Sequence, residues 1–109
     1  MLSSEITMNL ISGLKKIFED KLCLVVLYGS VARKEETSDS DIDIAVIIKD
    51  DLTESQKKLF IEFMSAMDLQ YDRVFSMVDI NLEQYNKWGD ILPFYRNIRK
   101  DGIVLWKAA

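Results

Sequence analysis

The sequence predicts an α/β (α+β) fold: a small mixed sheet with helices packed mainly on one side. Segments with apolar residues at helical spacing alternate along the chain with short apolar runs of strand length. The chain has 109 residues, 49% of them hydrophobic, which is enough to bury a core. No repeat, linker or low-complexity tract divides it. We therefore expect a single domain over residues 1–109.

The first half of the chain is expected to form two helices and two strands. Apolar residues recur at helical spacing over residues 4–20, which predicts an amphipathic helix. The apolar run 22–28 predicts the first strand, and a short helix is expected from Ser30. Residues 41–48 predict the second strand, because alternate residues form one continuous apolar face.

A second long helix is expected after Thr53, which forms a capping-box pattern with Gln56. The helix has an apolar stripe that we assign to the core: Leu59, Phe60, Phe63, Met64 and Met67. A third strand is predicted over residues 71–80.

The last quarter of the chain is expected to hold two short helices and a final strand. Asn81 is positioned to cap a short helix that runs to Trp88. Pro93 suits the first turn of the last helix, and Gly102 suits its end. Residues 103–106 predict a short strand.

Composition excludes several classes of protein. The chain has no histidine and one cysteine, so zinc and iron centres are not expected. Its net charge of −4 argues against direct nucleic-acid binding. It has no apolar run of membrane-spanning length and no signal-peptide pattern, and Cys23 lies in an apolar run as a small hydrophobe would. We therefore expect a cytoplasmic protein that does not bind membranes.

The most informative residues are Asp41 and Asp43, two positions apart where the second strand begins. Side chains at this spacing point to one face of a strand, so both carboxylates can converge on one divalent ion. Mg²⁺ is commonly held by one or two carboxylates together with nucleotide phosphates, and Mn²⁺ can substitute for it. Asp39 also forms an Asp-x-Asp pair with Asp41, but it lies in a polar serine-rich turn, so we favour Asp41 and Asp43.

These residues resemble the minimal nucleotidyltransferases of the DNA polymerase beta superfamily. The family pattern is Gly-Ser, ten intervening residues and Asp-x-Asp, and it runs here from Gly29-Ser30 to Asp41 and Asp43. Ala32-Arg33 and Ser40 also look like that family, whereas Lys34 stands where many members carry glycine. The resemblance implies a nucleotidyltransferase core, Mg²⁺ and a nucleoside triphosphate substrate, with ATP carried over from the family.

In this interpretation the Gly-Ser turn binds the triphosphate. Gly29 has no Cβ, so backbone can approach the phosphates closely, and amides at the start of the following helix point at anionic oxygens. Ser30 adds a hydroxyl donor. Arg33, one turn along, can reach the departing pyrophosphate, although it can equally be a solvated surface residue.

The resemblance also implies a third carboxylate, which binds metal and helps to deprotonate the acceptor hydroxyl. Two residues qualify. Asp72 is expected to open the third strand as Asp41 opens the second, and Asp79 closes the same apolar run. We favour Asp72 and keep Asp79 as the alternative.

Small nucleotidyltransferases of this size resemble antitoxins that accompany HEPN-domain ribonuclease toxins. The likeness implies transfer of AMP from ATP to a toxin tyrosine, since the predicted elements leave no residues for an acceptor domain. It is strongest over residues 27–46 and weaker over residues 92–103. Two alternatives stay open: an antitoxin that masks its toxin by contact, and a small-molecule nucleotidyltransferase with a site shared across a homodimer.

Overall fold

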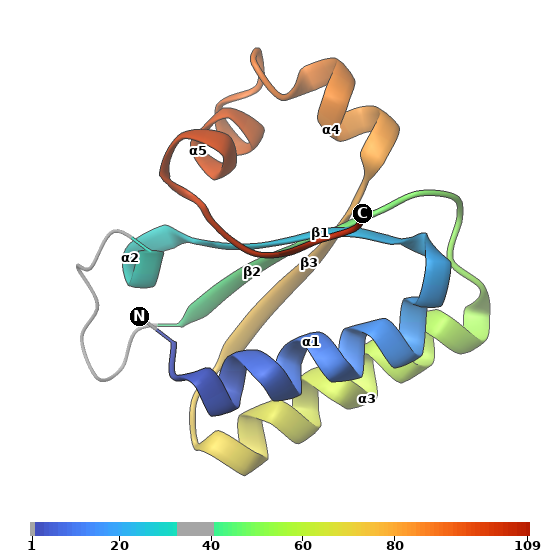
Figure 1. Cartoon of the computed structure of the whole chain (residues 1–109), viewed down its shortest axis with the longest axis vertical. Coiled ribbons are helices and arrows are strands. Elements are labelled where there is room, and N and C mark those ends of the chain that lie inside the picture. The colour runs from blue at the N-terminus through green and yellow to red at the C-terminus, as the bar shows by residue number, and fades with distance from the viewer. Residues whose placement is uncertain (1, 33–40) are drawn as a thin grey trace.

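The computed structural model describes residues 2–32 and 41–109. Within these residues a mixed sheet has the strand order β3-β2-β1-β4 (Figure 1). Its strands are β1 Leu22–Tyr28, β2 Ile42–Ile48, β3 Phe75–Asn81 and β4 Ile103–Lys107. β1 is antiparallel to both β2 and β4, whereas β2 and β3 are parallel. The prediction of a small mixed sheet is confirmed.

Helices lie on both faces of this sheet (Figure 1). The described helices are α1 Ser4–Phe18, the 3₁₀ turn Glu19–Lys21, α2 Gly29–Ala32, α3 Glu54–Tyr71, α4 Leu82–Trp88 and α5 Pro93–Asp101. The two long helices, α1 and α3, run side by side under one face, and the short helices α4 and α5 lie over the other. Most of the helical mass is thus on one side, as the sequence predicts.

The two faces have separate apolar clusters, because alternate residues of β2 point in opposite directions. Ile42, Ile44, Val46 and Ile48 belong to the larger cluster, beneath which α1 and α3 pack. The larger cluster also contains Leu10, Leu14, Phe18, Phe60 and Met67. Ala45 and Ile47 belong to the smaller cluster with Tyr85 of α4 and Ile98 of α5. Each fully buried aliphatic side chain stabilises the fold by roughly 1.5–3 kcal/mol.

The predicted helix boundaries in the second half of the chain are confirmed by their hydrogen bonds. Thr53 Oγ1 accepts from the Gln56 amide, and Gln56 Oε1 accepts from the Thr53 amide, both at 3.0 Å. Asn81 Oδ1 accepts from the amides of Glu83 and Gln84. Gly102 ends α5.

Three expectations were wrong in detail. β3 begins at Phe75 rather than at residue 71, because α3 continues through Tyr71. Asp72 is therefore not the first residue of a strand but the left-handed cap of α3, with φ 52° and ψ 42°. Leu59 of the expected core stripe is 46% exposed.

None of the helices in the described part of the chain combines the length and the apolar character needed to span a membrane.

Candidate functional site

Tyr28, Asp43 and Ser76 form a row across three neighbouring strands. Tyr28, the last residue of β1, pairs with Asp43 of β2, and Asp43 lies beside Ser76 of β3. Residues opposite one another in a sheet project from the same face. The shared face is the one covered by α4 and α5, because Tyr28 packs against the cluster that contains Ala45, two residues after Asp43.

Gly29 directly follows Tyr28 and lies against the Asp43 carboxylate. Its φ is +75°, a conformation that favours glycine. A Cβ built at Gly29 would lie 2.2 Å from Asp43 Oδ2, far inside contact distance. Only glycine therefore permits both this backbone turn and this position of the carboxylate. The close neighbour here is the Asp43 carboxylate, and the approach of Gly29 to phosphates stays a prediction.

Asp41 lies immediately before β2 and is exposed, whereas Asp43 is half-buried. The start of β2 is held by a hydrogen bond from the Ile42 amide to the Val74 carbonyl oxygen, 2.8 Å long. The pair thus consists of one carboxylate that faces solvent, Asp41, and one that lies against the Gly29 turn, Asp43. Carboxylate oxygens open to solvent on one side are suited to a hard cation that keeps water and phosphate ligands.

The pKa of the Tyr28 hydroxyl is affected by its surroundings in this site. Burial raises the pKa of its hydroxyl above the usual 10, and the negative charge of Asp43 raises it further. Both effects disfavour the phenolate. Tyr28 therefore stays a neutral hydroxyl beside the acidic pair at neutral pH.

The two candidates for a third carboxylate occupy different places. Asp72 is exposed and precedes Val74, whose carbonyl binds the start of β2, so it lies at the same end of the sheet as Asp41. Asp79 pairs with Val46, on the face covered by α1 and α3. It lines a separate cavity of about 420 Å³ together with Lys57 of α3.

Some predicted site residues lie outside the description. The residues that the structure describes do not include Arg33, Lys34, Asp39 or Ser40, or the side chain of Ser30. Among the residues that the structure describes, no three His, Cys, Asp or Glu side chains gather as a metal site. The roles of Asp41, Asp43 and Asp72 in metal binding therefore stay predictions.

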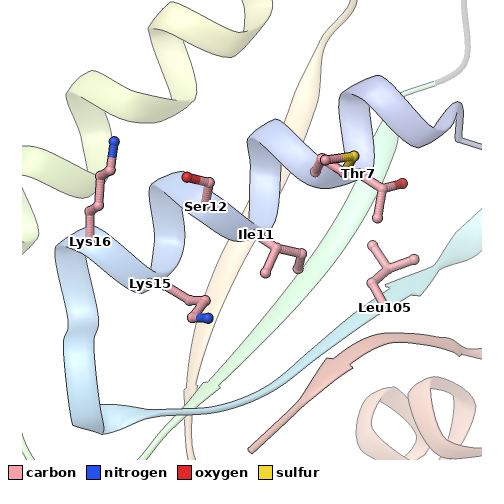
Figure 2. Close-up of a pocket in the computed structure, with 7 residues that line it drawn as sticks. Thr7, Ile11, Ser12, Lys15, Lys16 and Leu105 are labelled. Carbon is pink, nitrogen blue, oxygen red and sulfur yellow. The ribbon is translucent and has the colours of Figure 1, made fainter.

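Another cavity, of about 610 Å³, lies between α1 and β4 (Figure 2), and its residues Ile11 and Leu105 pack against the apolar cluster of the face opposite to Asp43. It is lined by Leu105 of β4 and by a row of α1 residues: Thr7, Met8, Ile11, Ser12, Lys15 and Lys16. None of the described residues that line it is acidic. This cavity is separate from the acidic pair and does not contribute to the candidate site.

Ser76 was missed by the sequence analysis. It sits beside Asp43 only because of the β2–β3 register, and no local pattern in residues 71–81 shows that pairing. Its hydroxyl is a further oxygen on the same sheet face as the predicted metal ligand.

The sequence model of the family described as "Polymerase beta, Nucleotidyltransferase" matches residues 12–109. The mixed sheet and its helices agree with that match. The chain belongs to this nucleotidyltransferase family.

Two relatives in Methanocaldococcus jannaschii are named as candidate protein adenylyltransferases. The chain is 32% identical to MJ0141 over 74 residues, which covers 68% of this chain and 75% of the relative. It is 28% identical to MJ0604 over 99 residues, covering 88% of this chain and 90% of the relative.

Solved structures of toxin–antitoxin complexes share the fold. One contains AMP-PNP, with a TM-score of 0.64 at 23% identity over 94% of this chain and 73% of the other. An MntA-HpeT mutant has a TM-score of 0.60 at 25% identity, covering 99% of this chain and 75% of the other. A complex of the MNT antitoxin with a tri-AMPylated HEPN toxin from Shewanella oneidensis has a TM-score of 0.53 at 21% identity, covering 97% and 74%.

Proposed function

We propose that this nucleotidyltransferase is a protein adenylyltransferase and antitoxin, which transfers AMP from ATP to a tyrosine of a cognate HEPN ribonuclease toxin. The observation that carries the proposal is the contact between the Gly29 turn and the Asp43 carboxylate. It joins a backbone turn suited to phosphates to a carboxylate suited to a cation. The names of the relatives and the complexes that share the fold supply the acceptor class.

The donor set fits magnesium, because Asp41 and Asp43 supply hard oxygen ligands two residues apart, a spacing that points both to one face of an extended segment. Mg²⁺, or Mn²⁺ in its place, would neutralise charge on the triphosphate when bound. Gly29, Ser30 and Arg33 would hold the phosphates through backbone amides, a hydroxyl and a guanidinium.

The reaction forms a bond between the tyrosine oxygen and the α-phosphorus of ATP, and breaks the bond to pyrophosphate. The phenolic proton must leave during attack, and we assign its acceptance to Asp72. Asp72 is preferred because it is exposed at the end of the sheet where Asp41 lies. Asp79 lies on the sheet face opposite to Asp43.

The proposal predicts that a HEPN-domain toxin is encoded beside this chain, and that toxin is the substrate for the test. Incubated with ATP, Mg²⁺ and the chain, the toxin should gain the mass of AMP on a tyrosine, as measured by intact-mass and peptide mass spectrometry. The modified toxin should then be separated from the chain under denaturing conditions, refolded and assayed for ribonuclease activity. We expect it to remain inactive, whereas untreated toxin carried through the same steps regains activity.

Two outcomes would replace the proposal. A toxin of unchanged mass that regains activity on separation indicates masking by contact. Label from ATP that appears only on small molecules indicates a small-molecule nucleotidyltransferase. We further propose that the chain acts in the cytoplasm, in a complex with its toxin.

A further inference from the structure

The aromatic side chains around the start of α5 form a connected series of rings. Phe94 contacts Tyr28 edge to face, with ring centroids 5.7 Å apart and an interplanar angle of 86°. Phe94 also contacts Tyr95 at 5.7 Å, and Tyr95 contacts Tyr85 at 6.0 Å. The series thus runs from the row that contains Asp43 to the buried side of α4.

The far end of this series is firmly held. The Arg99 guanidinium lies 4.7 Å from the centre of the Tyr85 ring, and donates to the Tyr85 carbonyl oxygen at 2.9 Å and to Asp90 at 3.0 Å. Tyr85 is 7% exposed, whereas Phe94 is 46% exposed. Phe94 therefore presents part of its ring to solvent in a set orientation, and an aromatic partner would bind it at a small cost in conformational entropy.

The exposed part of Phe94 lies next to the predicted phosphate site. Tyr28 precedes Gly29 in the chain and pairs with Asp43 across the sheet. α5 packs against both β1 and α2, the helix that begins at Gly29. A nucleoside triphosphate held at Gly29 needs a surface for its base, and Phe94, in ring contact with the residue before Gly29, is a half-exposed aromatic side chain nearby.

We infer that Phe94, backed by Tyr28 and Tyr95, is the stacking platform for the base of the nucleotide. The inference rests on the proposed function, because it places a base relative to phosphates at Gly29. Every base has a π face, so the platform supplies affinity and leaves base identity to other contacts. The chemical class of the ligand is a nucleoside triphosphate rather than a polyphosphate alone.

The test measures dissociation constants by calorimetry for two probes with Mg²⁺: AMP-PNP and inorganic tripolyphosphate. For Phe94→Ala we expect the Kd of AMP-PNP to rise about tenfold to a hundredfold, while that of tripolyphosphate stays within about twofold. Phe94→Trp should restore AMP-PNP binding because it keeps a π face, and Phe94→Leu should not. Ile91→Ala is the matched control, an exposed apolar side chain three residues away for which we expect no change.

Several outcomes overturn the inference. If Phe94→Ala binds AMP-PNP with wild-type affinity, Phe94 is not a stacking platform. An equal loss of affinity for both probes leads to the same conclusion. Full rescue by Phe94→Leu replaces stacking with a simple apolar contact. If Phe94→Ala binds AMP-PNP normally but fails to modify the toxin, the ring contacts the acceptor instead. If the wild-type chain binds neither probe, the proposed nucleotidyl transfer itself fails.

Discussion

The two faces of the sheet are built for different tasks, although the same strands make both. On the face under α1 and α3, Ile42, Ile44 and Val46 of β2 are fully buried. On the face under α4 and α5, Asp43 comes between these residues in sequence and is only half-buried. A single strand with a period of two thus carries a closed core on one side and a carboxylate at the end of the other.

The difference follows from how far the helices extend along each face. α1 and α3 are 15 and 18 residues long and run side by side along their face (Figure 1), although Asp79 near the end of β3 is exposed on it. α4 and α5 have 7 and 9 residues and cover less of theirs. Polar groups are costly to bury, so the shorter cover of α4 and α5 suits a row such as Tyr28, Asp43 and Ser76.

The sharpest test of this comparison replaces Asp41 and Asp43 together by asparagine. The change keeps shape and removes the charge that would hold Mg²⁺ against the triphosphate, so AMP transfer should fall on the order of 10³-fold or more. The fold should survive, as judged by circular dichroism.

The matched control is Ile44→Val, on the same strand but on the face under α1 and α3. It should cost about 0.5–1.5 kcal/mol of stability and leave AMP transfer per folded molecule unchanged. Undiminished transfer by the folded double variant would refute the assignment.

Asp72, just before β3, and Asp79, near the far end of β3, test which end of this strand contributes to catalysis. Asp72→Asn should lower kcat about 10²- to 10⁴-fold and leave ATP binding nearly intact, if Asp72 accepts the proton. Asparagine also tolerates the left-handed backbone at position 72, so the fold is preserved. Asp79→Asn, on the face opposite to Asp43, should change kcat less than about twofold. Single-turnover assays with the toxin measure both, and the reverse ranking would move the role to Asp79.

Gly29→Ala should reduce transfer on the order of 10²-fold. The new Cβ would overlap Asp43 Oδ2 and displace the carboxylate, and small displacements of reacting groups are expensive. The positive φ adds a stability cost of about 1–2 kcal/mol. Gly102→Ala is the control, because its Cβ would meet the Ile98 carbonyl oxygen at a φ of −72°. That variant should lose stability in denaturant unfolding but keep transfer per folded molecule, and equal losses of transfer in both would contradict the role of Gly29.

Local patterns predicted most of the fold and the acidic pair. Period-two alternation places Asp43 on the face opposite to Ile44, and the capping residues Thr53 and Asn81 mark two helix starts that the structure confirms. These features depend on neighbours in sequence, and so they can be read from the chain alone.

The features that could not be predicted depend on pairing between distant segments. The placement of Ser76 beside Asp43 comes from the β2–β3 register. The position of Asp72 depends on where α3 ends, and residues 66–71 suit a helix as well as a strand start. Phe94 meets Tyr28 only once α5 has folded back over β1. Register and docking of this kind are set by tertiary packing.

The smallest expected effect is on the titration of Tyr28. Burial is the larger cause of its raised pKa and the charge of Asp43 the smaller, so Asp43→Asn should lower the Tyr28 pKa while leaving it above 10. Absorbance titration of tyrosinate measures this pKa, with Tyr28→Phe in each background to isolate one of the four tyrosines.

Because the folded pKa of Tyr28 exceeds the unfolded value, its contribution to stability is complete below pH 10 and is lost as the pH rises through the folded pKa. In Asp43→Asn that loss should be complete at a lower pH than in the wild type. An unchanged Tyr28 titration would show that the Asp43 carboxylate and the Tyr28 hydroxyl do not interact. The acidic site and the aromatic residues around Phe94 would then be electrostatically independent.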